Sequence, residues 1–542
     1  NSIIEQLLKK RGISGEEAVT EFLSERPKKT YDPFLLPDME AGVDLILRAI
    51  SSGKKICIYG DYDADGITST CLMKTILERA GADVFFFLPS RFREGYGLNA
   101  LALDRLREQG AEVIITVDCG SVSYDEVEHA KSIGLEIVVT DHHTIGETRA
   151  DCLLINPKRA DSKYPFRDLA GCGVAYKFAQ AIQRKCDLPK SAITDILDLT
   201  AIGTIGDIVP LKDENRTLVK YGLREIRKAK RPGLRALIEG ISMNPESIGS
   251  EQIAYGIVPN LNACGRMEDA AYGAELMLAK DREDALPLVD KVTDFNSKRK
   301  KTQDETYKKC IQLISEQCAG SDFPVVFAEG AHEGITGIVA GKLKEKLNRP
   351  VLVVTESGDF LKGTGRSIET VDLYEIMNRQ KDLFERFGGH SGACGFTMKP
   401  EHLDELRKRL SDDIDAMSKE NPGIFDSSVS YDLELLPEEA GIDLAEELKA
   451  MEPFGNSNEE PKFLIKGAVP KYVNFMGQED QHVRFTSYFP GGRSIKCVLF
   501  GEAQEHSALI NSGCHVDVIG SLGINEWNGR RNAQMILDDV RG

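Results

Sequence analysis

The chain has 542 residues, 41% of them hydrophobic, which is enough to form several separate cores. It contains no run of about 18 consecutive apolar residues, as a membrane span would need, and its first ten residues lack the order of a signal peptide. The net charge of −18 argues against a protein that coats duplex nucleic acid, although a narrow basic groove is compatible with it. We therefore expect a cytoplasmic protein of several domains.

The first half of the chain predicts an α/β domain. Residues 1–45 carry short helical patterns broken by prolines, which indicates an N-terminal helical appendage. Residues 46–235 alternate apolar strands with amphipathic helices, the pattern of a largely parallel sheet. The five predicted strands are residues 55–59, 84–88, 112–117, 135–140 and 152–155.

The second half predicts a connector, a smaller α/β domain and a β-barrel. Residues 236–320 form the connector, with a long charged helix that carries a basic run at 298–301. Residues 321–424 form the second α/β domain, with strands near 325–328, 351–354 and 395–398. The pattern of residues 425–542 predicts short strands, with a hairpin signal at 527–530. Such a pattern is typical of a small barrel such as the oligonucleotide-binding (OB) fold.

Three predicted strands of the first domain end in acidic or imidazole side chains. Because parallel strands present their carboxyl ends at one edge of the sheet, these side chains should lie close together there. The strands at 55–59, 112–117 and 135–140 are followed by, respectively, Asp61, Asp63 and Asp65; Asp118; and Asp141, His142 and His143.

Crowded carboxylates repel one another unless a cation or a shared proton neutralises them, and the simplest explanation for this edge is a pair of divalent metal ions. Oxygen ligands with one or two imidazoles suit Mn²⁺, with Mg²⁺ as the alternative. The twelve cysteines contain no Cys-x-x-Cys pair, which argues against zinc and favours reduced thiols. Two ions about 3.5–4 Å apart would stabilise the attacking and leaving oxygens at phosphorus, so phosphoester hydrolysis is the matching reaction.

Each motif also has a simpler interpretation. Asp-x-Asp-x-Asp-Gly resembles part of a calcium loop, but Leu72 stands where that loop needs glutamate. A single His-His pair after a strand is more often a solvated turn than a ligand site. The coincidence of acids at three strand ends favours the metal centre.

Several motifs occur in the order found in the DHH phosphoesterase superfamily. They are Gly60-Asp61-Tyr62-Asp63-Ala64-Asp65-Gly66, Val117-Asp118, Asp141-His142-His143, Gly206-Asp207 and Asn262-Ala263-Cys264-Gly265-Arg266. Residues 332–340, 363–367 and 388–390 are similar to the superfamily's DHH-associated domain. Residues 452–456 and the hairpin at Trp527 resemble the additional barrel of its exonucleases that act on single-stranded DNA. The resemblance covers the chain from about residue 40 to its end.

The resemblance implies roles for individual residues. Asp63, Asp65, Asp118, His142 and Asp207 match the metal ligands, with Asp118 as the bridge between two ions per site. Asp61, Asp141 and His143, together with Asp118, match catalytic, supporting or substrate-facing positions.

The resemblance also implies a phosphate-binding set. Arg91, with Arg93 as its alternative, Arg266, Thr364 and Arg366 match positions that hold the end phosphate of the strand, and Gly388, Gly389 and His390 match a glycine-rich substrate loop. Arginine forks suit phosphate oxygens, and glycine lets backbone N–H groups approach a phosphate closely. An isolated arginine or glycine-rich turn is usually unremarkable surface, so these assignments depend on the resemblance.

The implied activity is a 5′-to-3′ exonuclease specific for single-stranded DNA, which releases 5′-mononucleotides in DNA repair and recombination. The resemblance further implies a monomer, with single-strand-binding protein and a helicase as partners. One alternative is a phosphoesterase for small substrates, which would be expected to end near residue 425; another is an inactive scaffold, which would have lost metal ligands. The basic run at 298–301 is either a strand contact or a solvated helix face, and Trp527 either stacks on a base or packs in the core.

Overall fold

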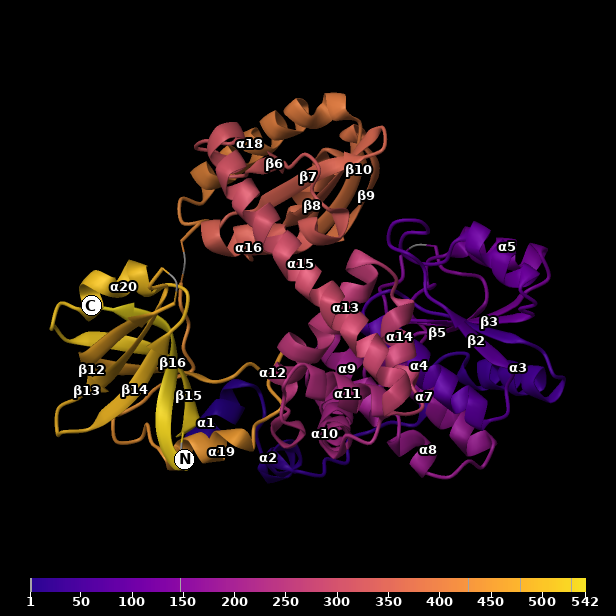
Figure 1. Ribbon diagram of the computed structural model, residues 1–542, viewed down its shortest axis with the longest axis horizontal. Helices are drawn as coiled ribbons and strands as arrows, with labels where there is room; N and C mark the ends of the chain where they lie inside the picture. Colours follow the sequence, from indigo (N-terminus) through magenta and orange to yellow (C-terminus); the bar gives the residue numbers. More distant parts are fainter. Residues whose placement is uncertain (1, 147, 427, 478, 528) are drawn as a thin grey trace. The chain divides into compact units, whose positions relative to one another are not determined.

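The computed structural model describes residues 2–146, 148–426, 428–477, 479–527 and 529–542 (Figure 1). The chain forms two compact units. Unit 1 comprises Asn1–Phe87, Gly97–Val258 and Ser428–Gly542, and unit 2 comprises Leu88–Tyr96 and Pro259–Ser427. Within the described ranges, no helix has both the length and the apolar character needed to cross a membrane. All twelve cysteines are free thiols, as predicted.

The first sheet, in unit 1, is parallel throughout, as predicted. Its strands follow the order β2-β1-β3-β4-β5. β1 and β3 are buried along their whole length because helices cover both faces of the sheet. The strands are β1 (Ile56–Tyr59), β2 (Val84–Phe87), β3 (Val113–Val117), β4 (Glu136–Thr140) and β5 (Leu153–Ile155).

Helices of unit 1 pack on this sheet and continue into an all-helical segment. α5 and α6 share a hydrophobic cluster with one face of the sheet, while α4, α7 and α9 pack against one another. α10 lies very close to α9, since a Cβ on Gly222 would come within 2.4 Å of the Leu197 carbonyl oxygen. The helices are α3 (Met39–Ser51), α4 (Ala64–Arg79), α5 (Ala100–Glu108), α6 (Tyr124–Ser132), α7 (Gly171–Lys185), α8 (Ser191–Thr194), α9 (Leu197–Gly206), α10 (Asp213–Lys228), α11 (Pro232–Gly240) and α12 (Ser250–Gln252).

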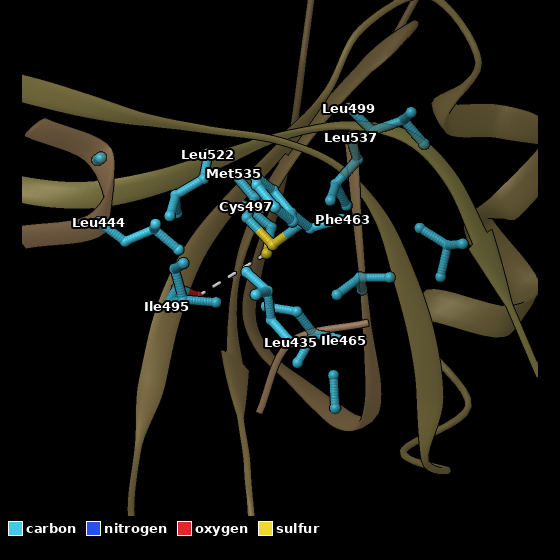
Figure 2. Close-up of a cluster of buried hydrophobic side chains, with 14 of the residues drawn as sticks. Leu435, Leu444, Phe463, Ile465, Ile495, Cys497, Leu499, Leu522, Met535 and Leu537 are labelled. Carbon is cyan, nitrogen blue, oxygen red and sulfur yellow. Dashed lines mark hydrogen bonds between the residues drawn. The ribbon is translucent and has the colours of Figure 1, made fainter. Parts of the chain in front are cut away.

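The predicted small barrel is present in the C-terminal part of unit 1. The strand order is β11-β12-β13-β14-β16-β15, and an additional β12–β15 pairing closes it. Its interior is filled by large apolar side chains such as Phe463, Ile465 and Met535 (Figure 2). The elements are β11 (Leu433–Glu434), α19 (Ile442–Lys449), β12 (Lys462–Met476), β13 (His482–Tyr488), β14 (Ser494–Leu499), α20 (Ala503–Ile510), β15 (Val516–Trp527) and β16 (Arg530–Arg541).

Segments near both ends of the chain contribute to the barrel. The N-terminal helix α1 (Ile3–Lys10) contributes Ile4, Leu7 and Leu8 to the barrel core, and α2 (Glu16–Leu23) follows it. Trp527 pairs with Arg530 where β15 meets β16, as the hairpin signal predicted. Asn528 and the Trp527 side chain lie outside the described residues.

Unit 2 contains the long helix and the second α/β sheet, both predicted. The sheet order is β6-β7-β8-β10-β9, with a parallel β6–β7 pair and antiparallel neighbours beyond it (Figure 1). The elements are α13 (Val258–Met267), α14 (Ala271–Leu278), α15 (Arg282–Gln317), β6 (Val325–Phe327), α16 (Glu333–Leu347), β7 (Val351–Ser357), β8 (Phe360–Arg366), α17 (Leu373–Arg379), β9 (Phe384–His390), β10 (Ala393–Met398) and α18 (Leu403–Glu420).

The basic run lies in the middle of α15. Lys298 forms an ion pair with Asp294 at 2.7 Å, and Lys301 lies 4.0 Å from Glu305. Arg299 donates to the side chains of Asn296 and Gln303. These contacts favour the solvated helix face over a strand contact.

Candidate active site

The first acidic side chains follow β1 directly. The chain leaves Tyr59, and Asp63 caps α4 by accepting a hydrogen bond from the Gly66 backbone at 3.0 Å. Asp65 lies in the first turn of that helix, and both Asp61 and Asp65 are buried. Asp61, Asp63 and Asp65 therefore lie close together, because the end of β1 leads directly into the first turn of α4.

Asp65 is held by the N-terminus of a second helix. Its carboxylate accepts hydrogen bonds from the backbone N–H groups of Gly171 (2.7 Å) and Cys172 (2.8 Å), the first residues of α7. A helix N-terminus favours an anion there. A Cβ on Gly171 would lie 2.4 Å from the Asp118 Oδ1, and one on Gly203 would lie 2.7 Å from the Asp65 Oδ1. Both positions accept only glycine without rearrangement of the carboxylates.

Asp118 and His142 come from the next two strands. Asp118 follows β3 with φ +61°, a conformation that aspartate tolerates better than most residues, and its N–H donates to the Thr140 carbonyl at 3.1 Å. The His142 Nε2 lies 3.2 Å from the Asp118 Oδ1 and 3.5 Å from the Asp207 Oδ2. Asp207 arrives from the far end of α9, where it is the C-cap residue. Four separate elements thus contribute to one cluster.

Ligand atoms gather in three overlapping sets. Within each set, the oxygen and nitrogen atoms lie within 4.8 Å of one another. Asp118 and His142 each belong to two sets. The sets are Asp118, His142 and His143; Asp65, His142 and Asp207; and Asp61, Asp63 and Asp118. We call these seven residues the acidic centre.

The protonation of the acidic centre reflects burial and crowding. Burial, with the charge of neighbouring carboxylates, raises the pKa of Asp65 to about 6 and that of Asp207 to about 8. The pKa of Asp118 is raised well above its usual range for the same reasons. Burial, together with the charge of His143, lowers the pKa of His142 to about 3, so its imidazole is neutral. A neutral imidazole among buried carboxylates is a ligand set for a cation.

Asp141 orients the neighbouring histidine. Its carboxylate accepts hydrogen bonds from the backbone N–H groups of Ser121 and His142, at 2.9 and 2.7 Å, and its Oδ1 lies 2.7 Å from the His143 Nδ1. Burial opposes the shifts, but the hydrogen bond and opposite charges of this pair lower the pKa of Asp141 and raise that of His143 to about 9. Asp141 therefore supports the site and is absent from the three sets.

The donor set fits divalent ions such as Mn²⁺ or Mg²⁺. It consists of carboxylate oxygens and imidazole nitrogens without a thiolate. The Asp118 Oδ1 is buried and accepts no hydrogen bond from any described residue. A buried carboxylate oxygen without a donor calls for a cation.

The candidate phosphate-binding residues belong to unit 2. Three of them lie around the N-terminus of α16. The Arg266 guanidinium donates to the Gly334 carbonyl at 3.0 Å, and a Cβ on Gly337 would lie 3.2 Å from both the Arg366 Nη2 and the Thr364 Cγ2. Phe92, next to Arg91, contacts the ring of His332, the residue that caps α16. The structure therefore brings Arg266, Thr364 and Arg366 together and places the Arg91 segment beside the same helix end.

The predicted glycine-rich loop is strand in the structure. Gly388, Gly389 and His390 end the edge strand β9, and Thr364 and Arg366 lie on β8. A Cβ on Gly389 would lie 2.4 Å from the Ala393 carbonyl oxygen, so close strand pairing explains this glycine. The register aligns these segments across β10, in the rows Thr364–Gly395–Gly388 and Arg366–Ala393–His390.

Sequence reasoning missed the groups that support the ligands. The Gly171 and Cys172 N–H groups and the Ser121 N–H are backbone donors, and a backbone donor has no residue-type signature. The Ala-Gly-Cys-Gly run at 170–173, where α7 begins, was a weak available signal.

Three comparisons bear on this arrangement. The DHH family N-terminal domain matches residues 55–204, the DHHA1 domain matches 320–416, and the RecJ OB domain matches 431–539. The single-stranded-DNA-specific exonuclease RecJ of Bacillus subtilis is 36% identical over 541 residues, covering 99% of this chain and 68% of that protein. This chain belongs to the RecJ family. RecJ of Escherichia coli is 30% identical, covering 99% and 95%.

Solved RecJ structures agree with the fold. The crystal structure of RecJ from Thermus thermophilus in complex with Mn²⁺ matches with a TM-score of 0.83 at 29% identity, covering 99% of this chain and 76% of that chain. The Mg²⁺ complex of RecJ from the same organism matches with a TM-score of 0.77 at 27% identity, covering 99% and 74%. RecJ from Thermus thermophilus thus has structures with both of the metals that the donor set suits.

Proposed function

We propose that this chain is a 5′-to-3′ exonuclease that hydrolyses single-stranded DNA to 5′-mononucleotides in DNA repair and recombination, using two Mn²⁺ ions or, alternatively, Mg²⁺. The observation that carries this proposal is the convergence of three ligand sets in one buried acidic centre. Like charges buried this closely repel one another, and divalent cations would offset that repulsion.

Asp63, Asp65, Asp118, His142 and Asp207 would hold the ions. The membership of Asp118 in two sets supports its role as the bridge. When bound, two ions stabilise the charge on both the attacking and the leaving oxygen at phosphorus. Asp141 holds the orientation of His143, which would face the substrate together with Asp61.

The groups around α16 would hold the terminal phosphate. Arg266, Arg366 and Arg91 supply charged donors, Thr364 supplies a hydroxyl, and the helix N-terminus favours an anion. The exposed Gly388, Gly389 and His390 would contact the strand backbone. Binding of the terminal phosphate would make hydrolysis begin at the end of the strand that carries it.

Two alternative functions fit less well. A phosphoesterase for small substrates has no need of a barrel, and residues 431–539 match the RecJ OB domain. An inactive scaffold would not retain all five ligand residues together in the buried centre. We further propose that the chain divides into domains at 1–45, 46–235, 236–320, 321–424 and 425–542. The protein would be a cytoplasmic monomer that works with single-strand-binding protein and a helicase.

End-labelled digestion tests the function. We expect a 40-nucleotide single strand labelled at its 5′ end to release labelled mononucleotide first, with Mn²⁺ or Mg²⁺, while the 3′-labelled strand shortens gradually and duplex resists. Release from the 3′ end would reverse the polarity. Activity confined to a dinucleotide would support the small-substrate alternative instead.

A further inference from the structure

A segment that leads into the barrel lies against the turn that follows Asp207. The Asn456 side chain donates to the Ile208 carbonyl at 2.6 Å, and the Asn456 carbonyl accepts from the Leu211 N–H at 2.7 Å. Both ends of the short connection between α9 and α10 are thus bonded to one residue that is distant in the chain. All of these residues belong to unit 1.

Local hydrogen bonds also hold this turn: the Ile208 N–H donates to the Ile205 carbonyl at 3.2 Å, and the Asn215 side chain donates to the Pro210 carbonyl at 3.1 Å. α9 ends at Gly206, Asp207 is its C-cap, and Ile208 follows with φ +57°. A β-branched residue in the left-handed region is uncommon and persists only where its surroundings hold it. The Ile208 side chain is 70% exposed, so side-chain packing does not supply that hold. The hydrogen bond from the Asn456 side chain to the Ile208 carbonyl adds to the local backbone bonds that hold this conformation.

The segment that carries Asn456 is itself firmly held. The buried Asn458 side chain donates to the carbonyls of Met451 (2.9 Å) and Pro453 (2.7 Å). The Arg216 guanidinium on α10 donates to the carbonyls of Met451, Glu452 and Pro453. Gly455 lies so close to Leu211 that a Cβ would come within 2.7 Å of its Cδ1. Asn456 therefore sits on a braced loop.

We propose that Asn456 is a positioning residue for the metal ligand Asp207, so that the segment leading into the barrel forms part of the support of the metal centre. The inference rests on the proposed role of Asp207. Asn456 forms hydrogen bonds with Ile208, the residue after Asp207, and with Leu211. These bonds fix the backbone that follows Asp207 and so orient its carboxylate. Outer-shell groups that orient a ligand influence metal affinity strongly.

Mn²⁺ binding without DNA tests the proposal, read from the electron paramagnetic resonance signal of free Mn²⁺. We expect Asn456→Ala to weaken Mn²⁺ binding about 10-fold. Asn456→Asp keeps the size of the side chain but replaces the amide donor with a carboxylate oxygen, which repels the Ile208 carbonyl oxygen. It should weaken Mn²⁺ binding at least as much. Saturating Mn²⁺ should restore hydrolysis, with an unchanged KM for the oligonucleotide.

Two further variants make the outcomes distinguishable. Asn511→Ala removes another exposed side-chain hydrogen bond to a backbone carbonyl, at the C-cap of α20, and should leave Mn²⁺ binding unchanged. Asp207→Asn removes the ligand itself and should weaken binding more than Asn456→Ala. If Asp207→Asn weakens binding but Asn456→Ala matches Asn511→Ala, the positioning role is wrong and the proposed function stands. If Asp207→Asn binds Mn²⁺ normally, the ligand assignment fails.

Discussion

The acidic centre of unit 1 and the candidate phosphate-binding groups of unit 2 are built in different ways. The acidic centre consists mainly of buried carboxylates and an imidazole, fixed by helix ends and backbone donors. The phosphate-binding groups are half-buried or exposed, and several lie on the strands β8 and β9. Buried like charges have a high free energy without a cation, whereas half-buried arginines keep part of their contact with water. We therefore expect the first region to govern kcat and the second to govern substrate affinity.

Asp118→Ala should have the largest effect. Because Asp118 belongs to two ligand sets, its loss should lower kcat at least about 1,000-fold, a change of about 4 kcal/mol in transition-state stabilisation. Removing one of several crowded carboxylates should leave the metal-free protein at least as stable as before. Measurements of kcat, thermal unfolding and anisotropy with a labelled single strand should show lost turnover in a folded protein that still binds the strand. Unchanged turnover would refute the bridging role.

Gly171→Ala tests whether the acidic centre depends on close approach. The added methyl group would overlap the Asp118 carboxylate and displace it, and a displacement near 1 Å lowers turnover about 100-fold. The matched control is Gly341→Ala on α16, where no atom lies within 4 Å of the new Cβ. That variant should keep full activity and gain about 0.5–1 kcal/mol in free energy of unfolding. If both variants retain full activity, the packing of α7 against Asp118 has no catalytic importance.

Arg366→Gln should affect affinity instead of turnover. Loss of a charged phosphate contact is worth about 1.5–3 kcal/mol, so kcat/KM for a 5′-phosphorylated strand should fall about 10- to 100-fold, mainly through KM. A strand with a 5′-hydroxyl should be affected much less. Arg409→Gln, at a half-buried arginine on α18 paired with Glu405 and Asp382, should change neither value. A fall in kcat alone would place Arg366 in the chemical step.

The two regions also differed in how far the sequence could predict them. The acidic centre was predictable because Asp61, Asp63 and Asp65 directly follow a buried strand, and the ends of parallel strands lie at one edge of the sheet. Asp207 has no such signal, since it ends a helix in an apolar stretch and its position depends on tertiary packing. Only the family resemblance located it.

The phosphate-binding groups were predicted by resemblance, but their local structure was not. Gly388 and Gly389 suggested a loop because glycine weakens strands, yet pairing of β9 with β10 overrides this local preference. The segment Leu88–Tyr96 follows a strand of the first sheet but groups with unit 2. Pairing with the next strand decides the first feature, and contacts with segments far along the chain decide the second.

The double variant Lys298→Gln with Lys301→Gln should have the smallest effect. Both lysines are exposed and lie near acidic residues one helical turn away, and such pairs contribute less than about 0.5 kcal/mol each. Strand affinity should change less than about twofold, and the slope of log affinity against log salt should stay the same. If these lysines instead contact phosphates, the slope should fall by about 0.7 for each lysine, because single strands release counterions in that proportion. A smaller slope would therefore extend the substrate-binding region of unit 2 along α15, while an unchanged slope would restrict it to the groups around α16 and β9.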